Sequence, residues 1–226
     1  MYEILMELPI FKGVGYSQLS EVIGTTKFHF LKYLDGETIV NAGESCTHLK
    51  FVISGAARLT TLSPDGRMKV MQTLNAPEVI APDFLFGRFT SYPLSAVAIG
   101  KTGILQIDKL DFMTILNSNQ VFLINFLNTL SIDAQKSVIG VLALTHGSLE
   151  ERIAFWMIAL TQRGAADLTL QCKQRDFYSL FGVQRSSFIA TLDHMKERGL
   201  LDYDQREIHF ISRAALIDIL TSSSEE

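Results

Sequence analysis

The sequence predicts an α+β protein with an N-terminal β-roll of the jelly-roll kind, a long connecting helix and a C-terminal winged helix-turn-helix. Three observations lead to this prediction: short β-type segments separated by turns, a long proline-free helical pattern, and two short helical segments joined by a glycine ahead of a strand–turn–strand pattern. We therefore expect a β-roll domain with its helical lead-in at 1–110, a long helix with its linker at 111–146, and a winged helix-turn-helix domain at 147–226.

The composition fits a globular chain with well-formed cores, because 47% of its 226 residues are hydrophobic. The chain has no signal-like start and no uninterrupted apolar run of about 20 residues. We therefore expect a cytoplasmic protein that does not enter a membrane. With a formal charge of −4, any affinity for nucleic acid has to come from a local basic patch.

The first 110 residues predict a helical lead-in followed by the β-roll. Residues 4–23 have a helical pattern that breaks at Pro9 and at the glycines of 13–15. Short β-type segments follow at 28–34, 48–54, 57–62, 69–74, 94–99 and 103–107. Turn residues separate them at Asp35-Gly36, Ala42-Gly43, Ser54-Gly55 and Pro64-Asp65-Gly66. This short spacing is typical of an all-β sandwich or barrel.

The stretch 82–93 is unusually aromatic. Its rings belong to Phe84, Phe86, Phe89 and Tyr92. We expect these rings to fill a core, which is the commoner role of large aromatic side chains. Packed against the long helix, they would instead wall an apolar pocket for an effector.

Residues 110–145 predict one long helix, because the segment has no proline and glycine only at Gly140. Small and apolar residues repeat along it at spacings of four and three, the pattern of a seam between two helices. The seam consists of Leu123, Leu127, Leu130, Ala134, Ser137, Val141 and Leu144. We favour a parallel homodimer through this seam, although packing on the β-roll would use the same residues. Ser137 interrupts the seam, and the flanking polar residues Asp133, Gln135 and Lys136 either face an effector or fix the register of the pair.

The stretch Arg175–Gly199 predicts two short helices joined by a tight turn at Gly182. Each helix has an apolar face, made of Phe177, Leu180 and Phe181 in the first and of Phe188, Leu192 and Met195 in the second. The second helix therefore packs through one face and presents the other.

The presented face of that second helix carries the groups expected to read DNA. It begins with Gln184, Arg185, Ser186 and Ser187, small polar and basic residues at a helix N-terminus. Such residues meet phosphates and reach base edges in a major groove. Ile189 and Ala190, in the next turn, complete the expected contact set.

A strand, a turn and a second strand follow at 200–203, 204–206 and 207–211, which is the pattern of a wing. Helix pairs with a glycine turn also occur in proteins that never bind DNA, but a wing directly after the second helix favours DNA binding. We expect Lys173, Arg175 and Arg206 to contact backbone phosphates. The basic excess around the helix pair is weak.

The order of these parts, and several short motifs, resemble the bacterial cyclic-AMP receptor protein / fumarate-nitrate regulator (CRP/FNR) family over nearly the full length of the chain. The motifs are at 8–13, 41–44, 53–55, 74–75 with 79–80, 152–154 and 181–187. The resemblance implies a cyclic-nucleotide-binding-like β-roll and a homodimeric, effector-controlled transcription regulator. It also implies a palindromic operator in double-stranded DNA and RNA polymerase as a partner. Arg185 takes the place of a base-reading arginine.

The chain departs from the family's cyclic-nucleotide pattern. Where relatives that bind cyclic nucleotides carry a Gly-Glu-Leu segment, this chain has Ala81 followed by Pro82, Asp83 and Phe84, and Leu94-Ser95 replaces an Arg-Ser pair. A cyclic phosphate buried without a cation is poorly compensated, so we expect neither cAMP nor cGMP to bind. The candidate effector pocket comprises Pro82, Asp83, Phe84, Leu94, Ser95, Asp133 and Ser137. Ala190 replaces a second arginine of the recognition helix, which implies a different operator sequence.

Other cofactors have weak support in the sequence. Only Cys46 and Cys172 are present, far apart and outside any CxxC pair, so we expect no disulfide, no cysteine-bound zinc and no iron–sulfur cluster. Haem is a further hypothesis, since some relatives of this type sense gases through it, and the candidate ligands are His29, His48 and His146. The hypothesis that the β-roll binds no effector, and serves only to hold the dimer, is also left open.

Two functions from other classes were weighed against a regulator. An enzyme needs convergent acid–base or nucleophilic groups, and the sequence has no such spacing, no metal-ligand cluster and no phosphate-binding glycine loop in the right context. We therefore expect no catalytic activity. A ligand-binding or scaffold protein with a purely structural helix-turn-helix is the remaining alternative.

Overall fold

The computed structural model describes residues 2–222, apart from the side chains of Lys136, Ile139, Gly140, Leu142, Ala143, His146 and Ser222. The described chain forms two compact units. Of the described residues, the first contains 2–58 and 74–134, and the second contains 59–73 and 135–222. These units divide the chain differently from the three expected segments, because the long helix is shared and a hairpin from the β-roll sequence belongs to the second unit.

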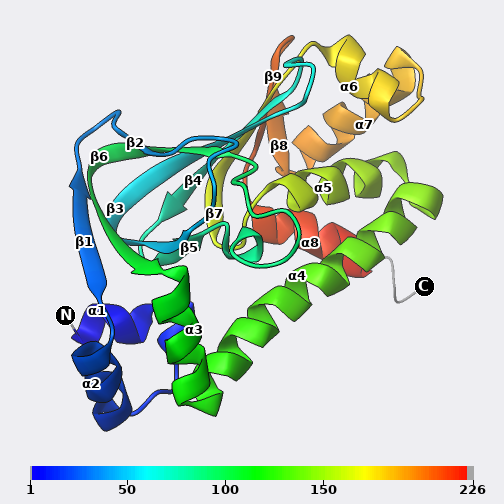
Figure 1. The fold of residues 1–226 in the computed structure, drawn as a ribbon. Coiled ribbons are helices and arrows are strands. Elements are labelled where there is room, and N and C mark those ends of the chain that lie inside the picture. The colour runs from blue at the N-terminus through cyan, green and yellow to red at the C-terminus, as the bar shows by residue number, and fades with distance from the viewer. Residues whose placement is uncertain (1, 223–226) are drawn as a thin grey trace. The chain divides into compact units, whose positions relative to one another are not determined.

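The first unit is the expected β-roll with its helical lead-in. It begins with α1 (Tyr2–Glu7), a 3-10 turn η1 (Pro9–Phe11) and α2 (Tyr16–Thr25). Its strands are β1 (Phe28–Tyr33), β2 (Thr38–Val40), the first part of β3 (His48–Leu62), β5 (Glu78–Ile80) and β6 (Ser95–Asp108). In the sheet β6 lies between β1 and β3, while β2 pairs with β6 and β5 with β3. Figure 1 shows α1, α2 and α3 (Lys109–Ser118) gathered at one end of these strands.

The expected turn at Ser54-Gly55 is wrong, because the chain continues through it as strand, and two segments expected as separate strands are also continuous. The segments expected at 48–54 and 57–62 form one strand, β3, and those at 94–99 and 103–107 form one strand, β6. Gly55 has a φ of +73°, and a Cβ there would lie 2.5 Å from the carbonyl oxygen of Lys101. This glycine therefore permits a close backbone approach inside the sheet instead of reversing the chain.

The helical region after the β-roll is also broken where one helix was expected. The chain forms α3 and then α4 (Gln120–His146), separated at Asn119, whose φ of −155° and ψ of 136° are extended. The Asn119 side chain accepts a hydrogen bond from the amide of Val121 at 2.8 Å. It thus caps the start of α4. Asparagine favours this position for local reasons that a pattern of apolar residues does not predict.

The first half of α4 is anchored to the first unit through one face. Phe122 and Phe126 are buried there, with ring centroids 5.5 Å from Phe11 and 5.2 Å from Phe112. Between them Asn125 donates hydrogen bonds from Nδ2 to the carbonyl oxygens of Ile10 and Lys12, at 2.9 and 2.8 Å. Because these side chains point into the unit, the predicted seam lies on another face of the helix.

The second unit combines a sheet with several helices. Its sheet runs from the end of β3 through β4 (Lys69–Asn75), β7 (Ala165–Gln171) and β9 (Glu207–Phe210) to β8 (Leu201–Tyr203). Its helices are the second half of α4, α5 (Leu149–Leu160), α6 (Gln174–Leu180), α7 (Arg185–Glu197) and α8 (Arg213–Ser222). Ser148 and Glu151 form a capping box that starts α5. Within residues 2–222, no helix is both long enough and apolar enough to cross a membrane.

Candidate nucleic-acid interface

The helix-turn-helix is built around the buried ring of Phe177 on α6. This ring lies 5.2 Å from Trp156 on α5, 5.1 Å from Phe181 and 5.5 Å from Phe188 on α7, measured between centroids. Edge-on and tilted contacts of this kind add to the area that the rings bury. Phe177 therefore joins the supporting helix α5 to both helices of the motif.

The turn between α6 and α7 is fixed from α5. Gly182 has a φ of +65°, the left-handed conformation that glycine adopts without strain. Arg152 donates from Nη2 to the carbonyl oxygen of Phe181 at 2.7 Å, and its guanidinium lies over the same ring. One expectation is wrong here: Leu180 is 47% exposed, because the final turn of α6 rotates it away from the core that holds Phe177 and Phe181.

The face of α7 that packs is the one predicted. Phe188, Leu192 and Met195 are fully buried, which confirms the apolar face expected from their spacing. The opposite face is open to solvent. Its exposed residues are Gln184, Arg185, Ser186, Ser187 and Ala190, while Ile189 is half-buried and packs against the core.

The N-terminus of α7 has free hydrogen-bond donors. Gln184 occupies the N-cap position, but its side chain makes no capping hydrogen bond. The first amides of the helix, from Arg185 onward, thus have no side-chain acceptor from this cap. Together with the helix dipole they form a site suited to an anion such as a phosphate.

The predicted wing is confirmed as β8, a turn and β9, with Asp202 opposite His209 in the antiparallel register. Asp204 closes the turn by accepting hydrogen bonds from the amides of Arg206 at 2.7 Å and Glu207 at 2.8 Å. These two amide donors hold the pKa of the Asp204 carboxyl below its usual value. The side chain of Arg206 projects from this turn into solvent.

Direct contacts that no local pattern in the sequence indicates join the wing to α7. The hydroxyl of Tyr203 donates to Asp193 Oδ1 at 2.5 Å, and Lys196 forms an ion pair with Asp202 at 2.6 Å. Burial, followed by the hydrogen bond with Asp193, raises the pKa of Tyr203 to about 12. Both contacts join residues in the middle and last turns of α7 to β8.

The basic residues around the motif fall into two groups. Lys196 pairs with Asp202, and Arg198 pairs with Glu150, so both serve structural contacts. By contrast, the side chains of Lys173, Arg175, Arg185 and Arg206 are exposed and make no ion pair with any residue in the described part of the chain. The charge available to a polyanion is therefore concentrated in the residues predicted to bind DNA.

The candidate effector residues are divided between the two units. Pro82–Phe84 form the 3-10 turn η2, in which Pro82 is buried and Asp83 is exposed. Leu94 is buried and Ser95 half-buried at the start of β6. Asp133 is half-buried on α4 in the first unit, whereas Ser137 is exposed and belongs to the second.

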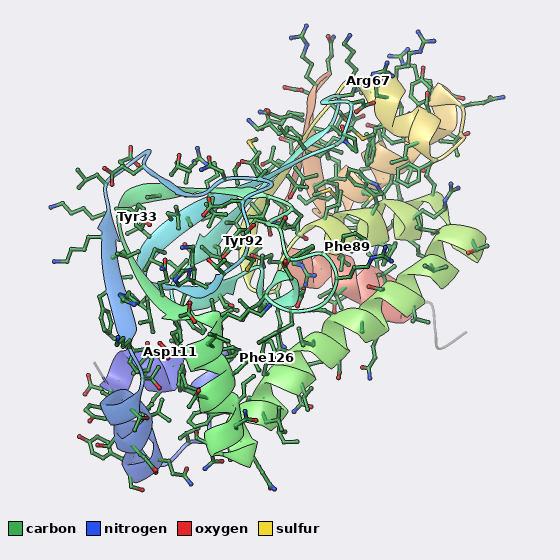
Figure 2. All side chains as sticks on the ribbon, viewed as in Figure 1. Tyr33, Arg67, Phe89, Tyr92, Asp111 and Phe126 are labelled. Carbon is green, nitrogen blue, oxygen red and sulfur yellow. The ribbon has the colours of Figure 1, made fainter. Side chains whose placement is uncertain are left out.

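Only some of the aromatic side chains in 82–93 are packed into the core. Tyr92 is buried and donates a hydrogen bond to the carbonyl oxygen of His48 at 3.0 Å, and Phe86 packs against Phe126 at 5.8 Å. Phe84 is half-buried. Phe89, labelled in Figure 2, is 76% exposed and does not contribute to the core.

Comparisons with known proteins agree on one family. Residues 30–119 match the model of the cyclic nucleotide-binding domain. The chain is 22% identical over 219 residues to a CRP-like cAMP-activated global transcriptional regulator of Mycobacterium tuberculosis, covering 92% of this chain and 94% of that one. Both matches indicate the CRP/FNR family of transcription regulators.

Solved structures show the same fold for this chain. The catabolite activator protein of Thermus thermophilus superposes with a TM-score of 0.55 at 19% identity, over 95% of this chain and 99% of that one. The sensor domain of the transcriptional regulator DNR from Pseudomonas aeruginosa gives a TM-score of 0.52 at 19% identity. The superposition covers 60% of this chain and 89% of that one. The α+β architecture predicted from the sequence is thus confirmed.

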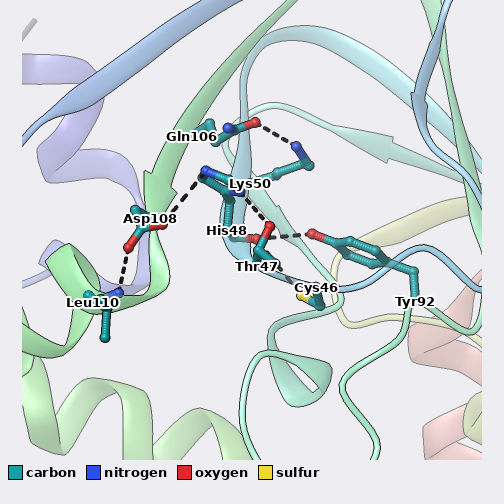
Figure 3. Close-up of polar contacts among 8 residues, drawn as sticks. All are labelled: Cys46, Thr47, His48, Lys50, Tyr92, Gln106, Asp108 and Leu110. Atoms are coloured by element: carbon teal, nitrogen blue, oxygen red, sulfur yellow. Dashed lines mark hydrogen bonds and ion pairs between the residues drawn. The ribbon is translucent and has the colours of Figure 1, made fainter.

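The histidines and cysteines considered as cofactor ligands have different surroundings in the structure. Figure 3 shows the surroundings of His48: its Nδ1 lies 2.8 Å from the Thr47 hydroxyl and its Nε2 3.9 Å from Asp108. Burial lowers the pKa of this imidazole. His29 is exposed, and the side chain of His146 lies outside the described residues. Cys46 and Cys172 are both buried thiols, one in each unit.

Among the described residues no group of three or more His, Cys, Asp or Glu side chains is placed to hold a metal ion. Nδ1 of His48 is within hydrogen-bond distance of the Thr47 hydroxyl, whereas Nε2 is too far from Asp108 for a hydrogen bond.

The contact between Tyr203 and Asp193 predicts a pH dependence of stability. Since folding raises the pKa of Tyr203 to about 12 from an ordinary value of 10, the unfolded chain loses this proton first as the pH rises. The free energy of unfolding is therefore expected to fall between about pH 10 and 12. Urea unfolding of wild type and Tyr203→Phe across this range measures it. The difference between the two proteins should shrink as the pH rises, and a constant difference would contradict the assignment.

Proposed function

We propose that this chain is a homodimeric, sequence-specific DNA-binding transcription regulator, controlled by an effector other than cAMP. The observation that carries the proposal is the uncapped, polar and basic first turn of α7, held outward by its buried face and flanked by a wing. Core packing alone does not require an exposed arginine and two serines at that position. They fit a helix that enters a major groove.

Each exposed residue of the interface has a distinct proposed role. Arg185, with Gln184, Ser186 and Ser187, reads base edges, and a bidentate arginine on guanine is the commonest such contact. Ala190, in the next turn of α7, allows close apolar contact with the DNA. The half-buried Ile189 packs against the core and supports the helix. Lys173, Arg175 and Arg206 bind phosphates and fix the register of the motif on the duplex.

The exposed stripe of α4 supports a dimer. Leu123, Leu127 and Val141 are 37%, 46% and 61% exposed, while Phe122 and Phe126 on another face are buried. Leu130 is half-buried, and Ala134 is exposed on the same stripe. A row of exposed apolar side chains along a helix is costly in water and is covered well by the same helix of a second copy. Twofold pairing doubles the site, so the operator is an inverted repeat, and RNA polymerase is the proposed partner in transcription.

The effector is proposed to differ from a cyclic nucleotide. The relative from M. tuberculosis is named for its activation by cAMP. In this chain Leu94 is buried and apolar at the position where the family's resemblance places a phosphate-binding arginine, and Asp83 adds a carboxylate in the neighbouring turn. An anion buried beside Leu94 would meet an apolar side chain in place of a guanidinium.

The dimer is tested by placing a charge in the α4 stripe. Leu127→Lys is expected to give monomers, because two ammonium groups would face each other across a desolvated seam. Size-exclusion chromatography with light scattering at micromolar concentration measures the mass. Leu110→Lys is the matched control, since Leu110 is 72% exposed on α3 and lies outside the stripe. A monomeric wild type would disprove the dimer.

Base reading is tested at Arg185. Arg185→Ala is expected to weaken binding to the preferred duplex by about 1 to 3 kcal/mol and to relax the preference at one base position per half-site. Selection of bound sequences from a random duplex pool measures both, and wild type should select half-sites about 34 Å apart. Arg206→Ala and Arg175→Ala are the comparison variants, expected to weaken all sequences alike. An unchanged selected motif in Arg185→Ala would show that another element reads the bases.

The effector proposal is tested by thermal unfolding with millimolar cAMP or cGMP. A native-state ligand at a hundredfold excess over its dissociation constant adds about 2.7 kcal/mol of stability, which visibly raises the melting temperature. We expect no rise. A rise that is abolished by Ser95→Ala or Ser137→Ala would make the chain a nucleotide sensor and overturn the proposal.

A further inference from the structure

The hairpin formed by the end of β3 and the start of β4, residues 59–73, is part of the DNA-binding unit although its sequence lies within the β-roll. Its strand β4 pairs with β7 in the second unit's sheet. Val70 is 2% exposed and belongs to the same apolar core as Phe177 and Phe188. The hairpin thus shares the apolar core of the second unit.

A buried glutamine locks one end of this hairpin. Gln72 is 1% exposed; its Oε1 accepts a hydrogen bond from the amide of Gln162 at 2.6 Å, and its Nε2 donates to the carbonyl oxygen of Leu160 at 3.4 Å. These contacts join β4 to the segment between α5 and β7. Because buried polar groups are costly when unpaired, the contacts hold the hairpin in register with β7.

The tip of the hairpin is equally well ordered. Asp65 Oδ1 accepts hydrogen bonds from the Ser63 hydroxyl at 2.6 Å and from the amide of Arg67 at 3.1 Å. Ser63 Oγ in turn accepts from the amide of Met68 at 3.0 Å, and Gly66 turns the chain with a φ of +69°. The guanidinium of Arg67 therefore projects from a fixed backbone.

This tip lies against the start of α6 and shares an open groove with it. The groove holds about 770 Å³, within the size of ligand-binding clefts, and it is lined by Asp65, Gly66, Arg67, Met68, Lys173, Arg175, Asp176 and Ser179. Figure 2 labels Arg67 at the end of the hairpin beside α6. Two of the lining cations are the residues assigned above to phosphate contacts.

The charges in the groove favour an anion. Arg67, Lys173 and Arg175 outnumber Asp65 and Asp176. Arg67 lies 3.5 Å from Asp65, but their side chains are 66% and 54% exposed, so this pair is weak and easily exchanged for a stronger acceptor. Arginine also suits the geometry of phosphate oxygens better than lysine does.

We propose that the hairpin tip is part of the DNA interface, with Arg67 binding a backbone phosphate next to those held by Lys173 and Arg175. This inference rests on the proposed function, because it takes the exposed face of α7 as the side that meets DNA. Arg67 adds affinity without reading sequence, since it contacts phosphate alone. A segment of the sensor sequence thereby takes part directly in DNA binding.

The test is the salt dependence of binding to the duplex that wild type selects. The logarithm of the association constant for DNA falls linearly with the logarithm of the salt concentration. Removing one phosphate contact from each of two protomers makes this slope shallower by about 1.8. Arg67→Ala should show this change, bind about tenfold more weakly at low salt, and select the same motif. Arg163→Ala is the matched control, because Arg163 is exposed in the same unit but precedes β7, whereas Lys173 follows it, a separation of about 23 Å along the strand.

A second variant acts in the opposite direction. Asp65→Asn keeps the acceptor oxygen of the tip but removes a carboxylate that repels phosphate and competes for Arg67. It should bind DNA several-fold more tightly than wild type, with an unchanged melting temperature.

The outcomes separate the two proposals. If wild type binds no duplex in a salt-sensitive manner, the proposed function fails. If wild type binds but Arg67→Ala keeps the wild-type slope and affinity, the hairpin contact is disproved while the function stands. A changed selected motif in Arg67→Ala would likewise overturn a phosphate role.

Discussion

The burial of one face of α7 against Phe177 is the constraint on which the functional surface depends. Phe188, Leu192 and Met195 are fully buried, and the ring of Phe188 packs edge-on to Phe177. With three consecutive turns of the helix fixed in this way, its first turn has only one orientation. Arg185 and its neighbours face solvent because the core holds the other side of the helix. Tyr203 and Lys196 form contacts between α7 and the wing strand β8.

A similar division of faces governs α4. Phe122 and Phe126 point into the first unit, and Asn125 ties the helix to the carbonyl groups of the N-terminal segment. These contacts leave the Leu123 and Leu127 side of the helix uncovered. In a single copy that apolar stripe stays in water. The anchoring that orients α4 is therefore what makes a second copy the natural partner of its exposed face.

Local patterns in the sequence were sufficient for the helix-turn-helix and the wing, because each depends on short-range spacing and a glycine turn. They did not reveal features set by distant contacts. Gly55 was interpreted as a turn, whereas it lets the backbone approach Lys101 within a continuous strand. The break at Asn119 comes from a side-chain cap, which an apolar repeat does not register. Leu180 was expected in the core, but the last turn of α6 directs its side chain away from that core.

The candidate site shows the same limit. Its exposed cations on α6, α7 and the wing followed from the motif, since a motif specifies positions along the chain. Arg67 did not, because it is about a hundred residues from the helices beside which it lies, and only the pairing of β4 with β7 brings it there. Its neighbours in the sequence indicate a turn and nothing more.

The most direct test of the central claim is the stoichiometry of the complex with DNA, measured by native mass spectrometry on wild type and a duplex selected from a random pool. The account predicts two chains per duplex, in a complex that dissociates as the salt concentration rises. One chain per duplex, or an assembly of the chain with no bound duplex at low salt, would contradict it.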